Sequence, residues 1–423
     1  MLNKNKNLSK TFCILPWTHI ATYNDGSALL CCVAKNTEDL NLNKMTFSEV
    51  WNSDHFKDAR IKMLNGERVS ACESCYKEED AGVRSHRQVE NHVWIKELGE
   101  EYINSIIEQT HEDGTVLTDM ITLDLRLGNT CNLQCLMCRP RDSSKWLKDA
   151  KILSETLQTD AKWDWKYKIQ NYSTSEFNWY KDPEFLNNFY ESANNIRHII
   201  FGGGEPLYIK EHHEIIKELV KRGLSKNIKL RYHTNGTILN EEIIELWNQF
   251  QAVELMISID GYDQINSIIR FPSVWKDIED NLKRYDETGD NITVKILCTV
   301  QALNIMYLPE FIDWIASQNY KKIVIDKDSY AFHCGTLHWP QYMTTKILPK
   351  ELKEIISTKL ISWAGDKKSY NVYKKVLDQV SFMNSEDAEV KQTEFLEYIE
   401  KIDILKDLKI KETIPEFFSF FKK

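Results

Sequence analysis

Three cysteines lie within eight residues of one another in this chain, at Cys131, Cys135 and Cys138. They follow an apolar run, residues 121–127, which predicts a strand that ends in a loop. Three thiolates in one loop can bind three corners of an iron–sulfur cube and leave the fourth iron open to a ligand. A zinc knuckle is the alternative, but it needs a fourth ligand, and no His follows Cys138 closely.

Composition excludes several kinds of protein. The 423 residues suffice for two or three domains, and 42% of them are hydrophobic. A formal charge of −9 argues against a nucleic-acid-binding surface. The first ten residues lack the apolar run of a signal peptide, and no stretch reaches the roughly 18 apolar residues of a membrane span. We therefore expect a cytoplasmic protein that contacts neither membrane nor nucleic acid.

After the cysteine loop, strand-like apolar runs alternate with amphipathic segments, which is typical of a parallel sheet with crossover helices. Chemistry in such folds gathers at the carboxyl ends of the strands. Polar motifs follow three of these ends: a glycine-rich turn at residues 202–206, a Thr-Asn-Gly turn at 234–236 and a Ser-Ile-Asp-Gly turn at 258–261. The expected strands are residues 121–127, 196–201, 228–232, 253–259, 292–300 and 323–326.

The cysteine spacing together with these turns resembles the radical S-adenosylmethionine (SAM) superfamily. The resemblance implies an α/β fold, a partial (β/α)6 barrel. It also implies a 4Fe-4S cluster on Cys131, Cys135 and Cys138 that reductively cleaves SAM to a 5′-deoxyadenosyl radical, which abstracts a substrate hydrogen. The residues that it assigns to SAM binding are Met137, Gly203, Gly204, Glu205, Pro206, Thr234, Asn235, Ser258, Asp260 and Arg270.

Two of these assignments have alternatives, and a third residue departs from the family pattern. Asp260 could instead cap the next helix. Arg270 suits bidentate binding of the SAM carboxylate, but a lone Arg is often simply solvated. Met137 stands where relatives usually have an aromatic residue, so it offers a different apolar wall near adenine.

A second group of cysteines lies in the first 90 residues. Residues 17–31 predict a β-hairpin with a strong turn signal at residues 24–26. The cysteine pattern around it resembles the auxiliary-cluster domain of SPASM/Twitch proteins, here placed before the barrel. The resemblance implies a second 4Fe-4S auxiliary cluster, with a four-cysteine zinc ribbon as the alternative. The implied ligands are Cys13, Cys31, Cys72 and Cys75, with Cys32 as a substitute for Cys31.

Substrate-side residues are harder to assign. The segment 141–195 is rich in aromatic residues that could cover the barrel mouth or pack the segment onto the barrel: Trp146, Trp163, Trp165, Tyr167, Tyr172, Trp179 and Tyr180. Arg139 and Arg141 could balance cluster charge or hold an anionic substrate. After the sixth expected strand, Tyr330, His333 and Cys334 are candidate hydrogen donors and the proposed catalytic residues.

Together these features predict an auxiliary-cluster domain at residues 1–95, a radical SAM barrel at 96–340 and a helical C-terminal extension at 341–423, in which we find no chemistry. The expected function is radical modification of a peptide or protein. Radical oxidation or epimerisation of a small molecule such as a sugar, nucleoside or cyclitol is the alternative. A non-catalytic zinc- or cluster-stabilised binding protein is the remote one. We expect a flavodoxin- or ferredoxin-type reductant as partner.

Overall fold

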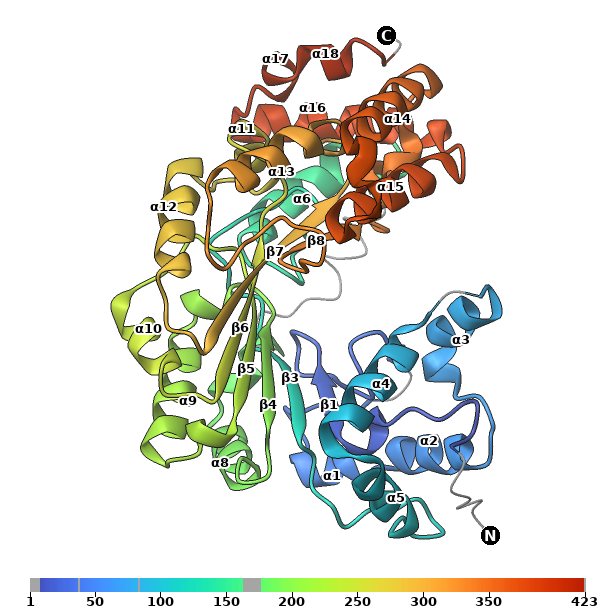
Figure 1. Ribbon diagram of the computed structural model, residues 1–423, viewed down its shortest axis with the longest axis vertical. Helices are drawn as coiled ribbons and strands as arrows, with labels where there is room; N and C mark the ends of the chain where they lie inside the picture. The colour runs from blue at the N-terminus through green and yellow to red at the C-terminus, as the bar shows by residue number, and fades with distance from the viewer. Residues whose placement is uncertain (1–7, 37–38, 83, 163–175, 422–423) are drawn as a thin grey trace.

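The computed structural model describes residues 8–36, 39–82, 84–162 and 176–421 (Figure 1). Its centre is one eight-stranded sheet with the strand order β2-β1-β3-β4-β5-β6-β7-β8. Neighbouring strands are parallel except β1 and β2, which form an antiparallel hairpin. The strands are β1 (His19–Thr22), β2 (Ala28–Leu29), β3 (Thr122–Arg126), β4 (His198–Gly202), β5 (Lys229–Thr234), β6 (Ala252–Ser258), β7 (Ile292–Val300) and β8 (Phe332–Thr336).

Helices fall into three groups along the chain. The N-terminal group is α1 (Phe47–Trp51), α2 (Asp54–Leu64), α3 (Glu73–Asp80), α4 (His86–Leu98) and α5 (Glu100–Glu108). The barrel group is α6 (Trp146–Thr156), α8 (Pro183–Ser192), α9 (Lys210–Lys221), α10 (Glu241–Trp247), α11 (Gln264–Ile269), α12 (Trp275–Asp286) and α13 (Leu308–Ser317). The C-terminal group is α14 (Lys350–Ala364), α15 (Asn371–Asn384), α16 (Gln392–Lys406), α17 (Ile410–Thr413) and α18 (Pro415–Phe418).

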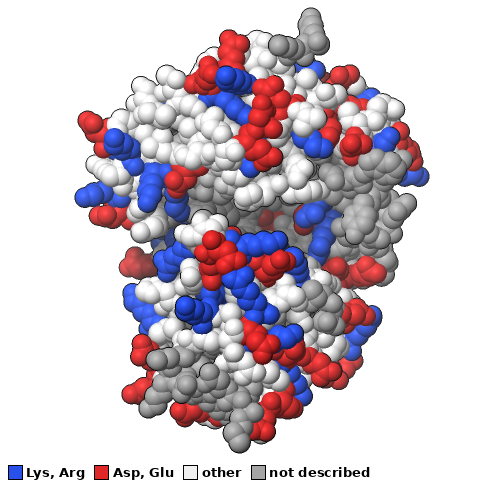
Figure 2. Space-filling view, turned by 90° about the vertical axis from the view of Figure 1, so that its right-hand side faces the viewer, with Lys and Arg blue, Asp and Glu red and all other residues white. Residues whose placement is uncertain are grey.

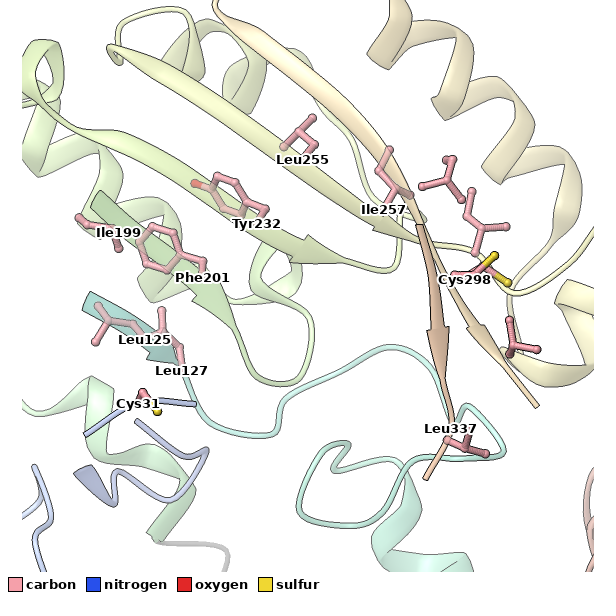
Figure 3. Packing of buried hydrophobic residues seen from close by; sticks show 14 of the residues in the cluster. Cys31, Leu125, Leu127, Ile199, Phe201, Tyr232, Leu255, Ile257, Cys298 and Leu337 are labelled. Atoms are coloured by element: carbon pink, nitrogen blue, oxygen red, sulfur yellow. The ribbon is translucent and has the colours of Figure 1, made fainter. Parts of the chain in front are cut away.

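Alternation along the strands gives the sheet two different faces. One face is apolar and fully buried, as Leu125, Ile199, Phe201, Tyr232 and Leu255 show (Figure 3). Each such side chain stabilises the fold by about 1.5–3 kcal/mol through removal from water. Helices α8, α9, α10 and α12 lie along one side of this sheet (Figure 1). The opposite side is flanked instead by the N-terminal and C-terminal helices.

We call the second face of the sheet the open face. Because side chains alternate along a strand, it carries the residues between the buried apolar ones. Most of them are partly exposed. On β3 to β8, its charged or titratable members are Asp124, Arg126, His198, Lys229, Arg231, His233, Glu254, Lys295 and His333. A hollow crosses the middle of the molecule when it is viewed from the side of this face, with basic and acidic atoms along it (Figure 2).

The predicted hairpin is confirmed, and it extends the barrel sheet. Tyr23 donates its backbone N–H to the Ser27 carbonyl at 2.8 Å, and Gly26 makes the turn at φ +81°. Strand β1 then pairs in parallel with β3, from His19 opposite Thr122. The auxiliary-cluster segment and the barrel therefore share one sheet, and their boundary near residue 95 stays a prediction.

The sixth strand was predicted at the wrong place. Residues 323–326 form no strand, and β8 starts six residues later, at Phe332. The run at 323–326 is apolar, but its Ile323 is buried outside the sheet, and the neighbouring Val324 is exposed. Among the helices, α1 and α2 follow one another closely but are separate, because Ser53 caps a new helix at Asp54.

C-terminal helices support the edge and the top of the barrel. Helix α15 packs along β8, where Thr336 Oγ1 donates to Gln379 Oε1 at 2.9 Å. In α16, the Tyr398 hydroxyl donates to the Leu136 carbonyl of the cysteine loop at 2.7 Å. No helix in the described part of the chain has both the length and the apolar character that crossing a membrane requires.

Candidate functional site

The three-cysteine loop leaves the carboxyl end of β3 and is anchored by its backbone. Gln134 N–H donates to the Phe271 carbonyl at 2.6 Å, and Leu136 N–H donates to the Ile269 carbonyl at 2.8 Å. From below, the indole Nε1–H of Trp146 donates to the Cys135 carbonyl at 3.2 Å. The backbone of the loop is thus held by α11 and the segment after it, by α6 and by α16.

The thiols of this loop suit a metal cluster. Cys131 and Cys135 are buried, and burial raises the pKa of Cys131 to about 12. A hydrogen bond from Cys138 lowers the pKa of Cys135, and the guanidinium of Arg270 lies beside it, with Nη1 4.0 Å from Cys135 Sγ. Thiolates need such a cation when water is excluded, so three cysteines and one Arg form a fitting cradle for a cluster.

Glycines bring the β4 turn against the start of the cysteine loop. Gly203 has φ +83°, and a Cβ on Gly204 would lie 2.1 Å from the Thr130 carbonyl oxygen. Backbone N–H groups of Gly204 and Glu205 donate to the carbonyls of Gly128 at 3.1 Å and Thr130 at 2.9 Å. The predicted SAM-binding turn and the cluster loop therefore form one continuous wall.

Glu205 is the centre of the hydrogen bonds that join three strand ends. It is 1% exposed, and burial raises its pKa to about 7. One carboxylate oxygen accepts from Thr234 Oγ1 at 2.8 Å and from Leu207 N–H at 3.0 Å, and the other accepts from Asn235 N–H at 2.7 Å. A carboxylate has about four acceptor positions. Glu205 therefore keeps one acceptor position for a further donor, such as an ammonium group.

Asp260 and Arg270 are brought together. Arg270 Nε lies 2.8 Å from Asp260 Oδ2, and Asp260 Oδ1 accepts from Thr299 N–H at 2.7 Å. Both side chains are buried. The two alternatives are therefore wrong: Arg270 is not solvated, and α11 has Asp263, not Asp260, at its N-cap position. Ser258 ends β6 and is partly exposed, and Met137 packs against the thiols of Cys131 and Cys135.

The four N-terminal cysteines surround one cavity. Cys13, Cys31, Cys72 and Cys75 line it together with His86 and Arg87. Cys32 faces away from it and contacts His86 Nε2 through Sγ at 3.7 Å. In the described ranges, no three His, Cys, Asp or Glu side chains are arranged to hold a single metal ion. A ring of thiols around a space fits a cluster, whereas zinc needs all its sulfurs about 2.3 Å from one point.

The three candidate hydrogen donors do not come together. Cys334 lies within β8 opposite Cys298, on the buried face, and burial raises its pKa to about 12. Tyr330 precedes β8, away from the carboxyl ends, and is 66% exposed. Only His333 lies on the open face. Residues 330–334 were expected after the sixth strand. This expectation is wrong, because His333 and Cys334 belong to that strand, β8.

Two family models match the chain. The model described as the radical SAM superfamily matches residues 125–315, and the model described as an iron-sulfur cluster-binding domain, SPASM, matches residues 13–76. Together they span more than half of the chain. The chain belongs to the radical SAM superfamily. This radical SAM protein is an enzyme with a SAM-binding 4Fe-4S cluster and a SPASM-type iron–sulfur site.

Individual relatives are distant. An uncharacterized protein of Methanocaldococcus jannaschii is 26% identical over 270 residues, which are 63% of this chain and 79% of the relative. Among solved structures, native anSMEcpe with bound AdoMet and Cp18Cys peptide is 16% identical, with a TM-score of 0.35, over 59% of this chain and 61% of that one. Streptococcus suis SuiB is 11% identical, with a TM-score of 0.36, over 75% and 63%. The radical SAM chain thus spans about three fifths of the length of these structures.

The aromatic segment mainly serves packing in its described part. Trp146, Trp179 and Tyr180 are buried, and Trp179 Nε1–H donates to the Asn24 carbonyl at 3.0 Å. Its other aromatic residues, Trp163, Trp165, Tyr167 and Tyr172, lie outside the described residues. Sequence reasoning missed Tyr398 and Lys375, because nothing in the local pattern of a charged helix shows which strand or loop it will contact.

Proposed function

We propose that this radical SAM enzyme modifies a peptide or protein by abstracting hydrogen from a C–H bond held over the open face of the sheet. The observation that carries the proposal is the position of the three-cysteine loop and the Glu205 turn at the carboxyl ends of the neighbouring strands β3 and β4. The SPASM-type site adjoins the same sheet through β1 and β3.

Each group of residues has a separate task in this proposal. A cluster on Cys131, Cys135 and Cys138 supplies the electron that cleaves SAM to methionine and a 5′-deoxyadenosyl radical. The open acceptor position of Glu205 binds the SAM ammonium group, and the backbones of Gly203 and Gly204 allow close approach. Thr234, Asn235 and Ser258 border the space for the rest of the molecule.

Asp260 and Arg270 position one another. Arg270 stands beside Cys135, and its remaining N–H donors are suited to the SAM carboxylate. Asp260 is held by Arg270 and by Thr299, so we assign it to orienting Arg270 and to shaping the ribose side of the pocket. Met137 supplies an apolar wall next to the loop.

The choice of a peptide rests on the SPASM domain, because peptide and protein modification is the commonest outcome among SPASM/Twitch relatives. Oxidation or epimerisation of a small molecule is the second candidate. A flavodoxin- or ferredoxin-type protein is the proposed electron donor in the cytoplasm.

The test begins with anaerobic reconstitution of the full chain. Iron and sulfide content should reach about eight iron atoms per chain, four for each cluster. The EPR signal of the reduced protein should change when SAM is added, and 5′-deoxyadenosine should form with dithionite. Cys138→Ala should remove the SAM-sensitive signal and keep the auxiliary one. An EPR signal of the reconstituted protein that does not change when SAM is added would contradict the proposal.

A further inference from the structure

The open face carries a positive charge surplus although the chain is acidic. Apart from the Lys229–Glu97 ion pair, four cations reach it against two carboxylates, Asp124 and Glu254, whereas the whole chain has a formal charge of −9. Three of the cations, Arg126, Arg231 and Lys295, stand on alternate strands of the sheet, β3, β5 and β7. A cleft with one sign of charge raises the local concentration of ligands of the opposite sign.

Most of these charges compensate one another. Glu254 forms ion pairs with both Arg231 and Lys295, one from each neighbouring strand. Arg126 Nη2 lies 3.8 Å from Asp124 Oδ2. The two carboxylates are therefore already engaged, and they hold the cations of β3, β5 and β7 in place.

Lys375 is the fourth cation, and it comes from α15 in the C-terminal extension. Its Nζ donates to His333 Nδ1 at 2.6 Å, and it forms no ion pair with any carboxylate of the described residues. Its side chain is only partly exposed, and burial lowers its pKa. An ammonium has three donors, so His333 leaves two of them for another acceptor.

The register places this ammonium near the predicted SAM pocket. Leu297 pairs with Ser258 on one side and with His333 on the other, so the three residues lie in one row across β6, β7 and β8. Ser258 is the last residue of β6 and borders the proposed SAM pocket. Lys375, which contacts His333 on β8, is therefore two strands away from Ser258 on β6.

We propose that Lys375 binds a carboxylate of the substrate, with Lys295 as the second cation beside it, so that peptide substrates carry Glu or Asp close to the modified residue. This inference rests on the proposed function and names its substrate class. A carboxylate at Lys375 would supply the anion that the described residues do not. Hydrogen bonds to charged groups are stronger than those between neutral groups, so the preference should be large.

The test compares two labelled peptides on the reconstituted full chain with SAM present. A fluorescein-labelled Gly-Gly-Glu-Gly-Gly peptide and its Gln counterpart differ only in the carboxylate. We expect the Glu peptide to bind about tenfold more tightly by fluorescence anisotropy. Lys375→Met should abolish the difference, and Lys375→Arg should retain most of it. Lys374→Met is the matched control, because Lys374 is the neighbouring, exposed residue of α15 and should keep the preference.

Two results would overturn the inference: equal affinity of the wild-type chain for both peptides, or a preference that survives Lys375→Met. If glutarate displaces the labelled Glu peptide as effectively as the unlabelled Glu peptide does, the ligand is a small carboxylate. That result would overturn the peptide assignment. Formation of 5′-deoxyadenosine by the wild type without substrate reports the proposed function separately. If the chain cleaves SAM but binds the Glu and Gln peptides equally, the inference about Lys375 is disproved and the proposed function is not.

Discussion

Arg270 and Asp260 form a buried ion pair, with Nε of the guanidinium 2.8 Å from Oδ2 of the carboxylate. The pair lies at the carboxyl end of β6, directly beside the thiol of Cys135. Because Asp260 is fully buried and Arg270 nearly so, each charge depends on the other for compensation. The pair therefore connects the strand end that borders SAM with the loop that binds the cluster.

Removing one partner of this pair should strongly destabilise the chain. Asp260→Asn leaves the Arg270 charge buried without its partner, so we expect the free energy of unfolding to fall by roughly 3–5 kcal/mol. Equilibrium urea unfolding of the cofactor-free chain measures this. Asp280→Asn is the control, since the Lys276–Asp280 pair on α12 is exposed and should contribute nothing measurable. Equal effects of the two substitutions would show that Asp260 is not essential to folding.

The stability of the cofactor-free chain should depend on pH through Glu205. An ordinary Glu titrates near 4.5, whereas burial raises the pKa of Glu205 to about 7. Between these values the folded chain binds more protons than the unfolded one, so this group makes the free energy of unfolding fall as pH rises. Relative to Glu205→Gln, the wild type should lose up to roughly 3 kcal/mol from pH 4.5 to pH 7. Urea unfolding at several pH values checks this, and parallel curves would contradict it.

Gly204 should tolerate no side chain. A Cβ there would lie 2.1 Å from the Thr130 carbonyl, so Gly204→Ala must push the β4 turn away from the cysteine loop. We expect a lower melting temperature and a weaker EPR response to SAM. Gly202→Ala is the matched control two residues earlier, where the nearest atom, Arg126 Cγ, is 3.7 Å away. Equal behaviour of both variants would argue against the close contact.

Adjacent cysteines at the auxiliary site should behave differently. Cys31 lines the four-cysteine cavity, whereas Cys32 is not among its lining residues and contacts His86. Cys31→Ser should therefore lower the iron content after reconstitution by about four atoms per chain, and Cys32→Ser should leave it unchanged. Iron and sulfide assays measure both variants. If Cys32→Ser loses iron and Cys31→Ser does not, Cys32 and not Cys31 is the cluster ligand.

Much of the site could be predicted because its signals are local. Cys131, Cys135 and Cys138 are close in sequence, and the turns after β4, β5 and β6 each sit at the end of an apolar run. The parallel sheet then brings these ends together by topology alone. The hairpin at Gly26 was equally local.

Contacts between distant segments could not be predicted. The pairing of Asp260 with Arg270 and the contact of Lys375 with His333 depend on how loops and helices pack. The sixth strand was missed because the apolar run at 323–326 looks more strand-like than β8, which contains His333 and Gly335. Cys31 and Cys32 differ only in the direction that each side chain takes after β2.

The contacts between α16 and the cysteine loop determine when the cluster site is completed during synthesis of the chain. Tyr398 donates to the Leu136 carbonyl, and Lys406 contacts Gln134 and Asp149. The ribosome makes the three cysteines more than 250 residues before these contacts. A nascent chain that stops short of Tyr398 thus presents its cluster ligands on a loop that lacks its contacts with α16. Iron–sulfur assembly factors would meet a finished site only after translation is nearly complete.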